Sequence, residues 1–220
     1  GNWNYYGYSG LNAGTLFSAA NSFILLEGGD GTENAFYGFV NANRTGMQAW
    51  VNSGGTLWIN AATWYVGSMD LGFGTTSTYN TAGKGTGYAA DGGHPLFGDM
   101  GYGSPGTSWT GTSFAHNHLT GAGFTPLILD GGARTILGGM TYGAGYVMLG
   151  GLTTNNFHSP STQAQALTRN IMDYTADQYG GFGGEVVPEP ATIILLGTGL
   201  LAMGAVGIRR RRENGAETED

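Results

Sequence analysis

Cysteine is absent from this 220-residue sequence, and charged side chains are scarce. Without cysteine, the chain has no disulfide, no thiolate nucleophile and no cysteine metal ligand. Only 10% of the residues are charged, and the net charge is -7. This acidic balance lacks the basic face that nucleic acids require, so we expect no nucleic acid partner. The low charge fits an exported protein whose surface is covered by neutral polar groups.

Glycine is abundant, with 43 residues, and hydrophobic residues make up 40% of the chain. This apolar content is enough to form a core, and the length suits one domain. We expect a globular body at 1–179, a glycine-rich linker at 180–187, a sorting segment at 187–212 and an acidic cytoplasmic tail at 213–220. The first residues show no basic region followed by an apolar run. Either a leader has been removed or the sequence is a fragment.

An uncharged apolar run occupies residues 191–208 and is followed by four arginines. Eighteen residues of helix span roughly 27 Å, close to the thickness of a bilayer core. The run therefore predicts a transmembrane helix, with the body outside because the arginines resist translocation. The arginines that stop the segment in the membrane are Arg209, Arg210, Arg211 and Arg212.

The residues before the apolar run complete a three-part pattern of motif, helix and basic cluster. The motif is formed by Val187, Pro188, Glu189, Pro190, Ala191 and Thr192. The whole segment resembles the PEP-CTERM sorting signal of Gram-negative bacteria. The resemblance implies exosortase as a partner, export, transient anchoring in the inner membrane and removal of the tail. It also implies a cell-surface or extracellular place and an association with exopolysaccharide and biofilm matrix.

The body begins with a strand, helix and strand. Residues 23–26 form a short apolar run, apolar residues between 36 and 51 recur at helical spacing, and 56–59 form a second apolar run. This order predicts two parallel strands joined by a helix. From 67 to 111, glycine, serine, threonine and tyrosine dominate, which predicts long loops with short strands.

The pattern becomes regular again at residue 125. A strand is expected at 125–129, and the segments 134–142 and 146–149 predict a hairpin around 143–145. A last helix should open at Ser159-Pro160, with Ser159 as its N-cap, and end near Gln178. We expect an α/β fold with a mainly parallel, flavodoxin-like sheet flanked by helices, a β-hairpin and long glycine-rich loops.

The segments "FILLEGGDG", "MQAWVNSGGTLWINAA" and "YGAGYVMLGG" resemble the class I glutamine amidotransferase-like fold, in its non-catalytic relatives. In enzymes of that fold a cysteine occupies the turn that matches residues 60–63. Here the turn holds Asn60, Ala61, Ala62 and Thr63. The resemblance therefore implies a body without cysteine-dependent amidotransferase activity.

His116 and His118 form the most suggestive constellation in the body. Side chains two residues apart on a strand point to one face, so both imidazoles could bind one metal ion. A third ligand would come from His94, His158, Asp91 or Asp130. The alternative is two histidines in a glycine-rich loop that make ordinary hydrogen bonds.

Two further patterns carry weaker signals. Ser113, His116 and Asp130 could form a triad only if the fold brings them together, and no nucleophile-elbow motif is present. The carboxylates of "EGGDGTE", residues 27–33, do not have calcium-loop spacing, so we interpret this stretch as a turn. Its glycines do not form a phosphate loop, and we expect no cofactor.

The aromatic start "NWNYYGY" has the residue types that stack on sugar rings. The candidate carbohydrate contacts are Trp3, Tyr5, Tyr6 and Tyr8, and the alternative is an ordinary packing segment. We expect a non-catalytic binding or structural body, with a metal-dependent hydrolase of matrix polysaccharide or peptide as the alternative. A homo-oligomer is compatible with the sequence and is not indicated by it.

Overall fold

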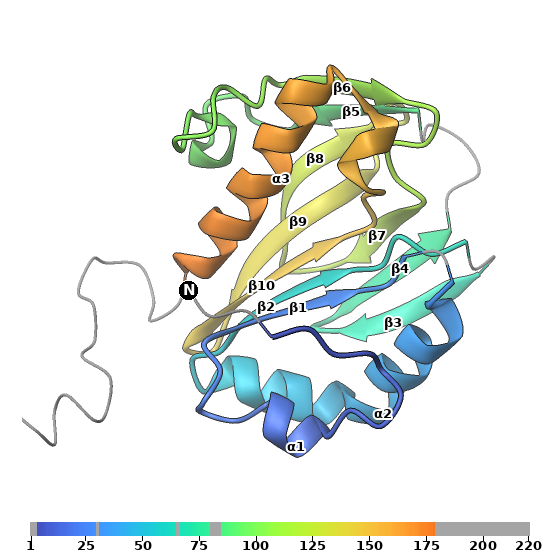
Figure 1. Ribbon diagram of the computed structural model, residues 1–220, viewed down its shortest axis with the longest axis vertical. Helices are drawn as coiled ribbons and strands as arrows, with labels where there is room; N and C mark the ends of the chain where they lie inside the picture. Colours follow the sequence, from blue (N-terminus) through green and yellow to red (C-terminus); the bar gives the residue numbers. More distant parts are fainter. Residues whose placement is uncertain (1–3, 30, 65–66, 80–84, 179–220) are drawn as a thin grey trace, which may run out of the picture. The chain divides into compact units, whose positions relative to one another are not determined.

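The computed structural model describes residues 4–29, 31–64, 67–79 and 85–178 (Figure 1). The linker, the sorting segment and the transmembrane helix predicted at 191–208 lie outside the described residues. Within the described ranges, no helix has the length and apolar character needed to span a membrane. The elements in chain order are α1 (Ala13–Leu16), β1 (Phe23–Glu27), α2 (Glu33–Asn52), β2 (Thr56–Asn60), β3 (Ser68–Gly72), β4 (Thr75–Tyr79), β5 (Thr86–Ala89), η1 (Pro95–Phe97), β6 (Ser108–Gly111), β7 (Asn117–Gly121), β8 (Thr125–Asp130), β9 (Thr135–Tyr142), β10 (Gly145–Gly150), η2 (Asn155–Phe157), β11 (His158–Ser159) and α3 (Ser161–Ala176).

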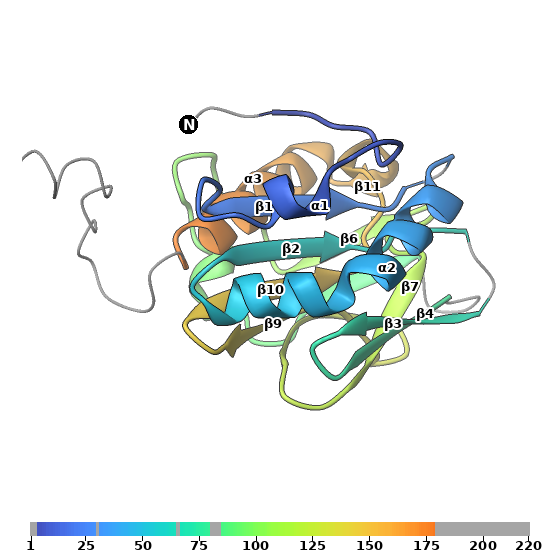
Figure 2. The ribbon, with the colours of Figure 1, turned by 90° about the horizontal axis from the view of Figure 1, so that it is seen from below.

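The sheet lies between the two long helices, with α2 along one face and α3 along the other (Figures 1 and 2). Alternating side chains explain this sandwich, because successive residues of a strand point to opposite faces. In β2, Leu57 and Ile59 join the apolar cluster beneath α2, whereas Trp58 joins the cluster beneath α3. In β10, Val147 and Met148 divide between the same two clusters.

The predicted strand–helix–strand unit is confirmed. The two strands β1 and β2 pair in parallel, with Phe23 opposite Thr56 and Glu27 opposite Asn60. The helix α2 between them buries the apolar stripe that the sequence indicated, including Phe36, Val40 and Met47. Gly28 follows β1 directly, and a Cβ there would lie 2.6 Å from the Phe36 ring, so only glycine lets the chain pass under α2.

The prediction of a mainly parallel sheet is wrong. Of the described strands, only β1–β2 and β2–β10 pair in parallel, and the sheet continues antiparallel through β9, β8, β5, β6 and β11. A side branch joins β3, β4 and β7 to β9. The result is a mixed sheet of eleven described strands that curls through β9 and β8 (Figure 1).

The physical reason lies in the connections. Parallel neighbours need a long crossover, which this chain supplies with α2 between β1 and β2 and with residues 61–144 between β2 and β10. Short turns rich in glycine instead force antiparallel pairing. The segment 67–111, interpreted as long loops with short strands, contributes β3, β4, β5 and β6, each of four or five residues. Their threonine and glycine content hides the alternation that marks a strand. The amidotransferase-like resemblance of the body is not supported.

The hairpin prediction is confirmed, since β9 and β10 pair antiparallel with Tyr142 opposite Gly145. The closing helix also forms, although Ser159 is not its N-cap. Ser159 belongs to β11, and Pro160 occupies the cap position without a side-chain hydrogen bond. Ile59, Trp50 and Val147 are buried in the core, whereas Leu25 is half-buried beneath α3.

Candidate functional site

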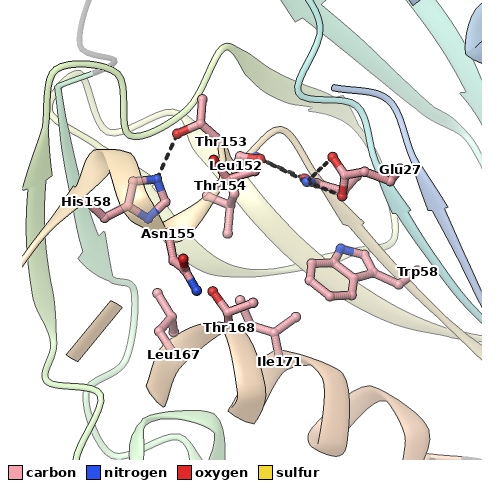
Figure 3. A pocket seen from close by; sticks show the side chains of 11 residues that line it. Glu27, Trp58, Leu152, Thr153, Thr154, Asn155, His158, Leu167, Thr168 and Ile171 are labelled. Atoms are coloured by element: carbon pink, nitrogen blue, oxygen red, sulfur yellow. Dashed lines mark hydrogen bonds between the residues drawn. The ribbon is translucent and has the colours of Figure 1, made fainter. Parts of the chain in front are cut away.

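A cavity of about 220 Å³ opens at the edge of the sheet where the parallel strands β1, β2 and β10 end (Figure 3). The strand register brings these ends together, because Asn60 lies opposite both Glu27 and Gly150. Such an edge is the usual place for a ligand on parallel strands. The lining residues are Glu27, Trp58, Asn60, Leu152, Thr153, Thr154, Asn155, His158, Leu167, Thr168 and Ile171.

Asn60 is the fixed centre of this edge. Its Nδ2 donates to both carboxylate oxygens of Glu27, at 3.1 Å each, and to the carbonyl of Leu152 at 2.8 Å. Its Oδ1 accepts from the backbone N–H of Leu152 at 3.0 Å. Asn60 is 5% exposed, so its amide joins β1, β2 and the segment after β10 through bonds shielded from water. The amide therefore holds the Glu27 carboxylate in one place.

Glu27 is the acidic residue of the cavity lining, and its pKa is strongly shifted. Part of the residue is open to solvent, but its carboxylate faces Asn60 and the cavity (Figure 3). Burial of the carboxylate raises the pKa of Glu27 to about 7, and the hydrogen bond from Asn60 opposes that rise. An acid with this pKa exchanges its proton near neutral pH. Shifts of this size, in a cleft and with a specific partner, are typical of functional sites.

His158 forms another part of the lining and stays neutral. The residue is buried, and this burial lowers the pKa of its imidazole to about 4. Its Nε2 lies 2.8 Å from the hydroxyl oxygen of Thr153, which itself donates to the carbonyl of Ser113. Because the threonine proton is used there, Nε2 donates to Thr153 and the ring carries its proton on Nε2. Figure 3 shows the other ring nitrogen on the side of Asn155.

The α3 side of the cavity is mostly apolar. Leu167 and Ile171 present buried side chains, and Thr168 lies between them with its hydroxyl donating to the Ala164 carbonyl at 3.1 Å. The Trp58 side chain forms the wall of the cavity that β2 contributes. Apolar walls with a few fixed polar groups are the usual composition of a small-molecule site. The arrangement suits a small neutral ligand that makes hydrogen bonds.

The structure places the two predicted metal ligands in different surroundings. The Nδ1 of buried His116 donates to the carbonyl of Ala62 at 3.0 Å, and its ring packs on Trp64 at 4.3 Å between centroids. His118 is half-buried, and burial, together with the nearby Arg134, lowers its pKa. Among the described residues, no group of three or more metal-ligating side chains is assembled. Metal binding at His116 and His118 stays a prediction.

The triad hypothesis meets a geometric obstacle. The Ser113 hydroxyl is buried without a hydrogen-bond partner, so it does not bond to His116. Asp130 lies instead against Arg134, whose Nε donates to it at 2.9 Å. Acyl-transfer chemistry needs a nucleophile within hydrogen-bond reach of its base, and these three residues do not meet that condition.

The aromatic start divides into three environments. Trp3 lies outside the described residues, whereas Tyr5 and Tyr6 are exposed by 91% and 65%. Tyr8 packs on Phe39 and donates its hydroxyl to the Glu27 carbonyl at 2.8 Å. Tyr8 therefore supports the strand that carries Glu27, and the stacking of sugars on Tyr5 and Tyr6 stays a prediction.

The cavity is not predicted by any pattern in the sequence. Glu27 lies in a stretch that predicts a turn, and His158 is one of several candidates for a third metal ligand. One available signal was the acid at the end of a strand expected to be parallel, where ligands bind in α/β sheets. Nothing in the sequence signalled the contribution of Asn60 or His158, because 92 residues separate Asn60 from its partner Leu152.

Comparisons with known proteins bear mainly on the end of the chain. A family model described as the PEP-CTERM protein-sorting motif matches residues 186–212. No curated protein matches the chain. Similar solved structures include an exo-beta-1,4-mannosidase from Opitutaceae bacterium strain TAV5, at 16% identity and a TM-score of 0.39, covering 60% of this chain and 22% of that one. A beta-galactosidase from Rahnella sp. R3 has 12% identity and a TM-score of 0.39, covering 76% of this chain and 23% of that one.

The chain thus spans less than a quarter of the length of these enzymes, and likenesses of this strength say nothing about the activity of the body. The sorting motif is specific, and exosortase is the processing partner that it implies. Its presence supports export and transient membrane anchoring of this chain. The match therefore supports a secreted protein that is sorted by a C-terminal tag at residues 186–212.

Proposed function

We propose that the body is a non-catalytic binding module of the cell surface or extracellular matrix, delivered there by its cleavable C-terminal tag. The observation that carries this proposal is the cavity at the ends of β1, β2 and β10. Its polar groups are held by protein hydrogen bonds, as in the Asn60–Glu27 pair, which preorganises them for a ligand.

The test of binding uses the full chain, purified in detergent, and exopolysaccharide isolated from the cells that produce this protein. Co-sedimentation measures retention of the protein, and a reducing-end assay measures cleavage. We expect retention without new reducing ends. A chain that is not retained would contradict the proposal.

The same experiment separates the alternative, a metal-dependent hydrolase of matrix polysaccharide or peptide. New reducing ends that disappear after dialysis against a chelator, and also in a His116→Ala, His118→Ala variant, would establish the hydrolase instead. Cleavage that survives the chelator would point to Glu27, whose pKa of about 7 suits a general acid or base. Peptide release is measured in parallel for the second substrate class.

The tag makes a separate prediction about the mature chain. The motif has a proline on each side of Glu189, a residue pattern that disfavours helix and suits cleavage by a protease. Protein from the native cell surface should therefore end close to residues 188–191, as measured by intact mass. Replacing Pro188, Glu189 and Pro190 by alanine should leave the full chain in the inner-membrane fraction. Surface protein that still ends at Asp220 would contradict this prediction.

A further inference from the structure

The side chain of Trp58 carries an unpartnered donor at the cavity. Trp58 is 4% exposed, and its Nε1–H is buried without a hydrogen-bond partner. Figure 3 shows this nitrogen on the edge of the ring that faces Glu27. A buried donor left without an acceptor costs about 1–3 kcal/mol, and folded proteins rarely leave one. The position therefore indicates an acceptor that comes from outside the protein.

The other deeply buried tryptophans of the described chain do find partners. Trp50 donates its Nε1–H to the carbonyl of Ser18 at 3.1 Å, and Trp109 donates to the carbonyl of Pro105 at 2.7 Å. Both indoles are surrounded by core side chains, as Trp58 is. Trp58 differs from them in lining the cavity. The missing partner is therefore a property of the site.

The acceptor that the Trp58 nitrogen faces in Figure 3 is the carboxylate of Glu27. The Asn60 side-chain amide donates to this carboxylate and to the Leu152 carbonyl, and it accepts from the Leu152 N–H. Asn60 therefore positions the site without having a group left for a ligand. Each carboxylate oxygen accepts more than one hydrogen bond, so Glu27 keeps capacity for a donor from outside.

The chemistry of the walls selects the ligand. An N–H donor beside a carboxylate needs a group that accepts and donates at once, and a hydroxyl does both. Neither lysine nor arginine lines the cavity, so an anion would face Glu27 without compensation. A cation would leave the Trp58 donor unpaired. Leu167 and Ile171 add apolar surface, and Thr154 and Asn155 add neutral polar groups.

We propose that this cavity binds one neutral saccharide unit, one hydroxyl of which accepts from Trp58 Nε1 and donates to the Glu27 carboxylate. Sugars combine apolar C–H faces with several hydroxyls, as the walls require. A volume of about 220 Å³ is below the usual range for drug-sized ligands, so the site takes a single ring and not an extended chain. This inference rests on the proposed function as a binding module.

The experiment observes the indole N–H directly. The full chain, labelled with ¹⁵N in detergent, is titrated with the methyl glycosides of glucose, galactose, mannose and N-acetylglucosamine. The chain has five tryptophans, and the signal missing in a Trp58→Phe variant identifies Trp58. We expect one or more neutral glycosides to shift that signal, and glucuronic acid and glucosamine to bind more weakly. Glycerol serves as the small-polyol comparator.

The variants separate this site from other aromatic surfaces. Trp58→Phe should weaken binding roughly fivefold to tenfold, because one hydrogen bond is lost. Glu27→Met, which keeps the length of the side chain but removes the acceptor, should weaken it similarly. Trp64→Phe is the matched control, because Trp64 is 48% exposed and does not line the cavity. A joint Tyr5→Ser, Tyr6→Ser variant should also leave the affinity unchanged.

Several outcomes would overturn the inference. The first is a Trp58 indole signal that no glycoside shifts, and the second is an equal shift of that signal with glycerol. The third is binding that is lost in Trp64→Phe or in the Tyr5→Ser, Tyr6→Ser variant but kept in Trp58→Phe. If Trp58→Phe does not fold, the Trp58 signal is assigned by elimination from single phenylalanine variants of the other tryptophans, and Glu27→Met then tests the site. If polysaccharide is retained while no glycoside shifts Trp58, the proposed function stands and this site is wrong.

Discussion

Two carboxylates in this protein have similar local sequences and different surroundings. Glu27 and Asp130 each end a strand and are each followed by two glycines. Asp130 is satisfied by its own turn, accepting from the backbone N–H groups of Gly132 and Arg134 and from the Arg134 guanidinium. Glu27 is held by a single amide, that of Asn60 from the neighbouring strand.

The difference shows how a structural acid differs from a candidate functional one. The Asp130 side chain is fully buried, and its ion pair and short-range bonds close the turn between β8 and β9. Among the described residues Glu27 has no cation as a partner; it lines a cavity, and burial raises its pKa. A cation and backbone donors hold the Asp130 carboxylate in place, whereas burial beside a neutral amide raises the pKa of Glu27.

The largest effect is expected at Asp130. Asp130→Ala leaves two backbone donors and the Arg134 guanidinium without their acceptor, and should lower the free energy of unfolding by roughly 3 kcal/mol. Denaturant titration measures the change. Asp91→Ala is the control, because the exposed Asp91 carboxylate accepts from the Gly93 N–H in a local turn. A loss at Asp130 no greater than at Asp91 would contradict the structural role.

The next effect concerns the neutral histidine of the cavity. The pKa of His158 is lowered from 6.5 to about 4, so the unfolded chain binds a proton that the folded chain does not. The stability from this group is present above pH 6.5 and is lost as the pH falls towards 4, by about 3 kcal/mol at most. His158→Gln should remove that part of the pH dependence. A profile unchanged in this variant would show that His158 titrates normally.

Asn60→Ala should have a smaller but double effect. The backbone N–H and carbonyl of Leu152 lose their buried partners, which should cost roughly 2 kcal/mol in unfolding free energy. The pKa of Glu27 should rise further, because the hydrogen bond from Asn60 lowers it. Thermal unfolding and carbon NMR of the Glu27 carboxyl measure the two effects. Asn155→Ala, in the same cavity, is the control and should change both quantities much less. A Glu27 pKa that falls in Asn60→Ala would contradict the role of Asn60 in holding the Glu27 carboxylate.

The smallest effect belongs to Glu27 itself. Its folded pKa of about 7 lies above the ordinary value of 4.5, so the folded chain keeps a proton that the unfolded chain has lost. The contribution of Glu27 to stability should therefore fall as the pH rises from 4.5 to 7, and Glu27→Gln should remove this contribution from the pH profile. Because Glu27 is partly open to solvent, Glu27→Gln should raise the free energy of unfolding above pH 7 by less than about 1 kcal/mol. A variant that is less stable at pH 8 would show that the ionised carboxylate stabilises the fold.

Elements that are marked by a local pattern of apolar residues or glycines could be predicted from the sequence. The two parallel strands, α2 and the β9–β10 hairpin follow from apolar runs, helical spacing and a glycine turn between two strands. The sheet as a whole was missed, because β3 to β6 contain threonine, serine and glycine with little apolar alternation. Their pairing depends on partners that are distant in the sequence, such as β4 with β7 and β5 with β8.

The sequence by itself determined the sorting tag, because a proline-flanked acid, an apolar run and an arginine cluster act in chain order and need no fold to bring them together. It also determined what is excluded, since no fold can supply a missing cysteine. Only the tertiary structure decided which acid faces a cavity. Glu27 and Asp130 look alike along the chain, and they differ because the parallel register sets Asn60 opposite Glu27, whereas Asp130 lies beside the arginine of its own turn. Local sequence fixes the chemistry of a side chain, but its solvation and its partners depend on which distant strands pack beside it.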